Sequence, residues 1–283
     1  GIDGVIIDWY GTEDVHDYAR LDHATQLAVD AADEFGLQYA ICYEDRTLRA
    51  MVDAGHIGPE EAVDKATQEL DAMAGRWFGR DGYTRVDDRP ILLVFGPEYL
   101  TDAQWQSVLQ GMTLRPAFLT LHQQRGPADG LYAWPPMWAS EDGALSWERL
   151  AEYYGRYTDR ASRAAYSIPA AFPGFNDIYA EAGAQETHGI LHHRDGATFA
   201  ETLELALSSG AQIAQPVTWN DFCAGTTTAP TPQFGYPYLE RVQAVSNLAG
   251  TPYRAADLRQ PAPTRRPAQQ HGVDVVDHPG VEA

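Results

Sequence analysis

Acidic and aromatic side chains recur directly after the apolar, strand-like stretches of this sequence. The set comprises Asp8-Trp9-Tyr10, Tyr43-Glu44-Asp45, Glu98-Tyr99, His122, Trp134, Trp138, Asn176-Asp177 and Trp219-Asn220-Asp221. Aromatic rings can stack on the apolar faces of sugars, and two carboxylates that flank a glycosidic bond can serve as acid and as base or nucleophile. A single Asp after a strand is usually a helix cap, and a single Trp usually belongs to the core. The repetition at successive strand ends therefore favours a carbohydrate-binding cleft.

Other kinds of chemistry find little support in the residue types. No lysine in this set could form a Schiff base, and no Gly-x-Ser-x-Gly motif is present. His188 and His192 would have metal-ligand spacing only on a helix, and Gly189 argues against a helix there. Cys42 and Cys223 belong to strands that would not be neighbours, so we expect no disulfide between them. We therefore expect no nucleotide, flavin or transition-metal cofactor, and the abundance of acids leaves a structural calcium open.

Strand-like and helix-like stretches alternate along most of the chain. The spacing of apolar residues predicts strands over 4–9, 37–43, 90–95, 116–121, 130–134, 165–170 and 211–219. It predicts helices over 18–35, 59–78, 101–112, 147–163, 199–208 and 236–248, with Gly36 ending the first and Pro59 beginning the second. Such alternation indicates an α/β fold with a parallel sheet and helical crossovers.

Seven strands, with one more before residue 1, would close a (β/α)₈ TIM barrel. We therefore expect a barrel that this chain enters at about its second strand, because an apolar strand at 4–9 needs neighbours on both sides. The alternative is an open doubly wound sheet, against which no Gly-rich phosphate loop follows any strand. In a barrel the active site lies at the C-terminal ends of the strands, where the acidic and aromatic set falls. We expect one barrel domain over 1–250 and a flexible, disordered Pro-rich tail over 251–283.

The balance of acidic and basic residues limits the classes of partner that this protein can bind. Twenty basic residues against forty acidic ones give a formal charge of −20. Both nucleic acid and anionic membrane surfaces repel so acidic a protein, and no apolar run approaches the ~20 residues that cross a bilayer. We expect a carbohydrate partner, with no nucleic acid and no membrane, and leave the oligomeric state open.

Three segments carry a resemblance to a known group. They are residues 1–11 (GIDGVIIDWYG), residues 94–97 (VFGP) and residues 218–226 (TWNDFCAGT), the last followed by Pro230-Thr231 and Phe234-Gly235-Tyr236. Together they resemble the glycoside hydrolase 71/99-like group, relatives of the endo-α-mannosidases and α-1,3-glucanases. The likeness runs from Gly1 to about Leu248. It implies a (β/α)₈ barrel whose first strand precedes the start seen here.

The resemblance also implies roles for particular positions. The group's pattern is Asn, an acid, an aromatic, any residue, Glu, Gly and Thr, and its first acid matches Asp221. In the endo-α-mannosidase branch that carboxylate is thought to act as a base that helps the sugar's own 2-hydroxyl displace the leaving group. The general acid of the pattern falls at Ala224, and a further Glu falls at Ala229. A methyl group cannot donate a proton, and loss of general-acid assistance typically costs about 10²–10⁴-fold in rate.

Three interpretations of Ala224 stay open. The first is an engineered Glu→Ala knockout, and the second is a natural loss that leaves a sugar-binding pseudoenzyme. In the third, another carboxylate supplies the proton from a different strand. The candidate catalytic residues are Asp221, Asp177, Glu98 and Glu44, with Ala224 at the position of the family acid. The candidate substrate-binding residues are Asp8, Trp9, Tyr10, Tyr43, Trp134, Trp219 and Asn220.

The first hypothesis is a glycoside hydrolase-like protein that cleaves internal bonds of a polysaccharide or oligosaccharide. The second is a non-catalytic carbohydrate-binding protein on the same barrel. The class of substrate predicts a secreted or extracytoplasmic location.

Overall fold

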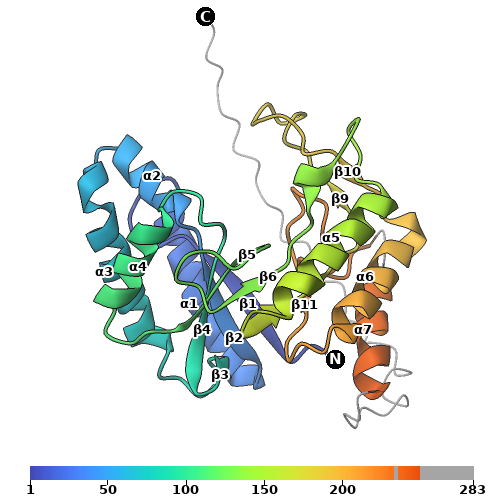
Figure 1. Cartoon of the computed structure of the whole chain (residues 1–283), viewed down its shortest axis with the longest axis horizontal. Helices are drawn as coiled ribbons and strands as arrows, with labels where there is room; N and C mark the ends of the chain where they lie inside the picture. The colour runs from blue at the N-terminus through green and yellow to red at the C-terminus, as the bar shows by residue number, and fades with distance from the viewer. Residues whose placement is uncertain (233–234, 249–283) are drawn as a thin grey trace, which may run out of the picture.

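The computed structural model describes residues 1–232 and 235–248 of the chain (Figure 1). Its main sheet holds six parallel strands that neighbour one another in chain order. They are β1 (Gly4–Trp9), β2 (Gln38–Tyr43), β4 (Arg89–Val94), β5 (Ala117–Leu121), β6 (Gly130–Tyr132) and β7 (Tyr166–Ile168). A short strand, β3 (Arg85–Val86), pairs antiparallel with β4. Sequential order without a reversal fits part of an α/β barrel and not a doubly wound sheet.

The expected strand over 165–170 is split at Pro169, which has no N–H to give to a ladder. β7 ends before this proline, and β8 (Ala170–Ala171) follows it and pairs in parallel with β11 (Gln215–Pro216). The expected last strand, 211–219, is thus reduced to two paired residues. Within the described residues β1 pairs with β2 alone, and β1 and β11 are not paired. The described strands therefore form an open half-barrel, which fits part of the α/β barrel that we expected.

The described part of the chain contains seven α-helices, which lie outside the sheet. In Figure 1, α1–α4 lie towards the left of the view and α5–α7 towards the right. The first group is α1 (Tyr18–Phe35), α2 (Arg46–Asp53), α3 (Ala62–Trp77) and α4 (Asp102–Gly111). The second is α5 (Trp147–Ala161), α6 (Ala197–Ser208) and α7 (Pro237–Leu248). The sequence pattern missed α2, whose eight residues are too few to establish a helical period. Ser246 on α7 donates a hydrogen bond to the carbonyl of Gly1 at 3.0 Å, so the last described helix lies beside the start of β1.

Local chemistry explains where several helices begin and end. Gly36 takes the left-handed conformation that ends α1, with φ of 67°. Thr101 begins α4 by accepting a hydrogen bond from the backbone N–H of Gln104, whose side chain reaches back to the N–H of Thr101. Ser146 caps α5 through the N–H of Arg149. The smaller elements are the 3₁₀ turns η1 (Pro59–Glu61), η2 (Met137–Ala139) and η3 (Arg194–Gly196) and the antiparallel pair β9 (Phe175–Asn176) and β10 (Ile190–Leu191).

Alternation along each strand separates two cores. Tyr39, Ile41 and Tyr43 of β2 point outward into the large apolar cluster beneath α1–α4. Ala40 and Cys42 point inward to a second cluster that fills the concave side of the sheet. No helix in the described ranges is long and apolar enough to cross a membrane. The expected tail over 251–283 lies outside the described residues.

Candidate functional site

Two carboxylates lie side by side on the inner face, at the C-terminal ends of neighbouring strands. Asp8 on β1 is in register with Cys42 on β2, and Glu44 follows Cys42 by two residues, so both acids project to the same face. The backbone N–H of Glu44 donates to the carbonyl of Trp9 at 3.0 Å, which holds the two strand ends together. Glu44 is almost fully buried, whereas Asp8 is exposed at the free edge of β1. Asp8 is therefore the more exposed residue of the two.

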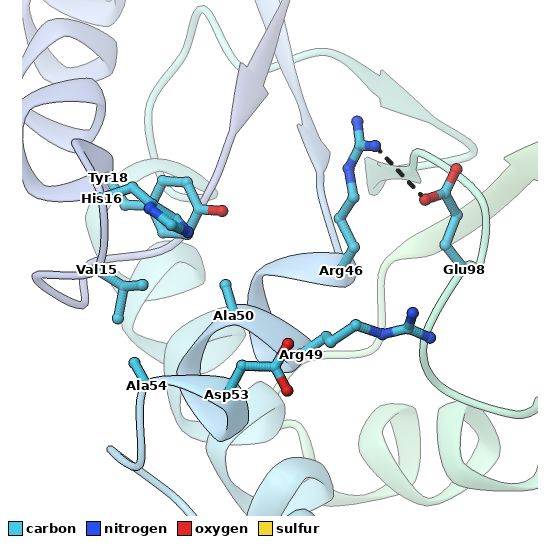
Figure 2. A pocket seen from close by; sticks show the side chains of 9 residues that line it. All are labelled: Val15, His16, Tyr18, Arg46, Arg49, Ala50, Asp53, Ala54 and Glu98. Atoms are coloured by element: carbon cyan, nitrogen blue, oxygen red, sulfur yellow. Dashed lines mark ion pairs between the residues drawn. The ribbon is translucent and has the colours of Figure 1, made fainter. Parts of the chain in front are cut away.

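Arg46 clamps the buried member of this pair. Its Nε lies 2.8 Å from Oε2 of Glu44, and its second nitrogen lies 3.4 Å from Oε1. Its remaining nitrogen lies 3.7 Å from Oε2 of Glu98, the ion pair drawn in Figure 2. The guanidinium also lies 6.0 Å from the centre of the Phe95 ring. Arg46 is not among the expected site residues, although it directly follows the Glu44-Asp45 pair at this strand end.

The surroundings raise the pKa of both acids. Burial, followed by the nearby charge of Asp8, raises the pKa of Glu44 to about 8 against the opposing effect of Arg46. Burial of its carboxyl group raises the pKa of Asp8 to about 6. The Tyr10 hydroxyl donates a hydrogen bond to Asp8, and burial raises the pKa of Tyr10 so that it remains a donor. Near neutral pH this pair of acids therefore holds about one proton, which resides mainly on Glu44.

Asp221 lies on the loop after β11, close enough for its charge to raise the pKa of Asp8. Its Oδ1 accepts the N–H of Ala224 at 3.0 Å, and its own N–H donates to Oγ1 of Thr218 at 3.0 Å. These two bonds form a tight turn that fixes the direction of the carboxylate. Trp219 and Phe222 on the same loop are 49% and 63% exposed. The loop therefore brings an acid and two accessible aromatic rings to the open side of the half-barrel.

Ala224 itself is a core residue. It is 4% exposed and packs in the apolar cluster between the sheet and α5 that includes Val217 and Phe175. Its carbonyl accepts the N–H of Asn176 at 3.0 Å, and the carbonyl of Cys223 accepts the N–H of Ile178 at 3.0 Å. These bonds join the loop after β11 to the segment at β9.

The prediction that sugar rings stack on Trp9 and Tyr43 is wrong. Trp9 and Tyr43 are fully buried on the outer face of the sheet, where their ring centroids lie 5.7 Å apart. Trp9 donates to Oδ1 of Asp22, and the Tyr43 hydroxyl donates to Oε2 of Glu69. Each is adjacent in the chain to an inward-facing acid and therefore points the opposite way. Neither ring has a free face to offer a ligand.

Of the remaining candidates, Asp177 is tied up in backbone hydrogen bonds, whereas Trp134 and Asn220 lie near the strand ends or beside Asp221. Asp177 is buried and its two oxygens accept the N–H groups of Tyr179 and His188 at 3.3 and 2.8 Å, so it braces a loop. Trp134, half-buried, meets Phe95 edge to face at 5.3 Å on the inner face, near the strand ends. Asn220 is exposed beside Asp221.

Metal-binding groups are not evident in the described part of the chain. No cluster there of three or more His, Cys, Asp or Glu residues could hold a metal ion. Cys42 is buried, Cys223 is exposed, and both are free thiols.

The fold is similar to that of solved glycoside hydrolases. A family 99 endo-alpha-mannosidase from Bacteroides thetaiotaomicron superposes with a TM-score of 0.61 at 15% identity, over 87% of this chain and 79% of that one. A structure described as a glycoside hydrolase-like protein gives a TM-score of 0.63 at 16% identity, over 86% and 81%. Endo-glycoceramidase II from Rhodococcus sp. gives 0.50 at 10% identity, over 84% and 70%.

No protein-family model matches the chain, and no curated protein sequence matches it significantly. The likeness is therefore one of fold, and it is consistent with the glycoside hydrolase 71/99-like group to which the sequence motifs point.

Proposed function

We propose that this protein binds a polysaccharide or oligosaccharide across the C-terminal ends of its strands and cleaves glycosidic bonds inside the chain. One observation carries the proposal. Asp8, an accessible acid with a raised pKa on β1, lies within electrostatic reach of Asp221 on the loop after β11. Two carboxyl groups in unlike environments are what glycoside hydrolysis requires, because one must donate a proton while the other is ionised.

We assign the acid to Asp8 and the base or nucleophile to Asp221. With its pKa raised to about 6, Asp8 can retain a proton and give it to the departing glycosidic oxygen. The turn at Ala224 orients Asp221 for attack or for activation of a sugar hydroxyl or water. Trp219, Phe222 and Trp134 provide aromatic surface for sugar rings, and Asn220 can bind a hydroxyl.

The other carboxylates suit supporting roles. Glu44 is clamped by Arg46 and has little surface of its own. Glu98 is exposed and pairs with the same arginine. Both oxygens of Asp177 are taken by backbone N–H groups. We therefore assign Glu44 and Arg46 to tuning the charge around Asp8.

The test is the release of reducing ends from a panel of α-mannans and α-glucans. Asp8→Asn and Asp221→Asn should each lower the rate by about 10²–10⁴-fold, because each removes one half of the acid–base pair. Asp64→Asn, an exposed change on α3, is the matched control and should leave the rate unchanged. Cleavage that survives both active-site changes would refute the assignment.

A second candidate function is carbohydrate binding without cleavage. The observation that favours it is the buried methyl group of Ala224 at the position of the family acid. Calorimetry would then detect glycan binding while no reducing ends are released. Cleavage by the unaltered chain would exclude this candidate, and absence of binding to any glycan of the panel would exclude both.

We also propose that the protein acts outside the cytoplasm, where polysaccharides of this kind are met. Detection of the protein only in the cytosolic fraction of its cells would contradict this.

A further inference from the structure

A pocket of about 650 Å³ lies beside the acidic pair, between the loop after β1 and helix α2. Figure 2 shows Val15, His16 and Tyr18 on one side of it and Ala50, Asp53 and Arg49 on the other, with Arg46 and Glu98 at its edge. Its volume falls within the roughly 300–1,000 Å³ of small-molecule sites. None of the expected site residues except Glu98 lines this pocket.

Two routes of side-chain contact link the pocket to the candidate catalytic acids. On one wall the Tyr18 ring stacks on Tyr10 with centroids 5.3 Å apart and planes at 23°, and Tyr10 hydrogen-bonds to Asp8. On the other wall Arg46 joins Glu98 to Glu44. A ligand that passes over Arg46 would therefore reach from the acids into the pocket without leaving the protein surface.

The lining combines apolar and hydrogen-bonding groups of both signs. Ala50 and Ala54 offer apolar surface beside the buried Val15, and the half-buried Tyr18 offers an aromatic ring. Arg49 and Asp53 are exposed on α2, and within the described residues neither forms an ion pair. The Arg49 guanidinium lies 5.5 Å from the centre of the Tyr99 ring, which steadies it without using all of its N–H donors.

This lining suits a sugar. A pyranose has apolar faces and a rim of hydroxyls that both donate and accept, so it needs an apolar wall with donors and acceptors around it. Arg46 and Arg49 balance Asp53 and Glu98 in charge. A uronic acid would be drawn to the arginines but repelled by the two carboxylates, whereas a neutral hexose can use all four groups.

We propose that this pocket is a subsite for neutral sugar units of the glycan that lie away from the bond cleaved between Asp8 and Asp221. The inference rests on the proposed function and adds to it a direction for the bound chain. The glycan runs from the open side of the half-barrel across Arg46 and onto α2. Longer oligosaccharides therefore gain affinity from a surface that short ones do not reach.

The experiment compares α-linked manno- and gluco-oligosaccharides of two and six units by calorimetry. Asp221→Asn serves as the common background, so that no ligand is consumed. Arg49→Ala and Asp53→Ala should each raise the Kd of the hexasaccharide by about tenfold and leave that of the disaccharide unchanged. Arg20→Ala on α1 and Asp64→Ala on α3 are matched controls, because both residues are exposed and outside the pocket.

Hydrogen exchange gives a second readout that does not depend on the variants. The hexasaccharide should slow exchange over residues 15–18 and 46–54 more than the disaccharide does. The subsite is refuted if the hexasaccharide binds, but neither pocket variant changes its Kd and it protects residues 15–18 and 46–54 no more than the disaccharide does. In that case the proposed function stands. If neither oligosaccharide binds, the proposed function fails and the subsite fails with it.

Discussion

Glu44 and Asp45 are consecutive buried acids whose carboxylates serve different parts of the fold. Glu44 turns to the inner face and meets Arg46, whereas the Asp45 carboxylate accepts the backbone N–H groups of Glu98, Tyr99 and Leu100 at 2.8–3.3 Å. It also accepts Nε1 of Trp105 at 3.2 Å. Asp45 thereby fixes the loop that carries Glu98 to the edge of the pocket.

Replacing Asp45 with Ala should strongly destabilise the protein. The change leaves several buried N–H groups without an acceptor, so we expect the free energy of unfolding to fall by about 2–4 kcal/mol. Urea unfolding measures it, with Asp64→Ala as the exposed control, which should change it by about 0.5 kcal/mol or less. Equal stability of the two variants would show that the loop does not depend on this carboxylate.

Replacing Ala224 with Glu should harm the fold without improving catalysis. The new carboxyl group would enter the apolar cluster around Val217 and Phe175, which costs at least about 2 kcal/mol. Because we assign the proton donor to Asp8, the rate of reducing-end release should not rise. A variant that cleaves where the original chain does not would instead show that Ala224 marks a lost general acid, and would favour the binding function for the chain as it stands.

The pKa of Glu44 predicts a particular dependence of stability on pH. Its value of about 8 in the folded chain exceeds its ordinary value of 4.5, so the folded state holds a proton that the unfolded chain has lost. The stabilisation is complete below pH 4.5 and is lost as the pH rises to about 8, by at most about 1.4 kcal/mol per pH unit. Glu44→Gln removes this titration.

Urea unfolding of both forms across this range measures the effect. The original chain should lose more stability with rising pH than Glu44→Gln does. Parallel curves for the two proteins would contradict the raised pKa.

Removing the exposed ring of Trp219 should weaken glycan binding without weakening the fold. Trp219 is half exposed on the loop that carries Asp221. We expect Trp219→Ala to raise the Kd for a bound oligosaccharide by about tenfold and to leave the melting temperature nearly unchanged. Phe35→Ala at the end of α1 removes a comparably exposed ring far from Asp221 in the chain and should leave binding intact. If both changes weaken binding equally, the Trp219 effect is not specific to the loop after β11.

The spacing of apolar residues, together with the residues that begin and end helices, determined much of the fold. The strand over 4–9 and the helix over 18–35 lie where the apolar spacing and Gly36 put them. Parallel pairing in chain order follows from alternating strands and helices, because each crossover helix returns the chain to the same end of the sheet. Asp8 and Asp221 could be named as candidates because acids after strands gather at one edge, and the role of Asp221 came from the family resemblance; both assignments stay predictions.

Tertiary structure alone decided which neighbours at each strand end face inward. In Asp8-Trp9 and Tyr43-Glu44 both residue types suited a sugar site, but adjacent residues on a strand point to opposite faces, so only the acids reach the inner side. The pairing of Arg46 with both Glu44 and Glu98, and the reach of Asp221 to Asp8, join segments far apart in the chain. Side-chain direction and long-range proximity arise only when the sheet twists and its helices pack, and no local pattern in the sequence encodes them.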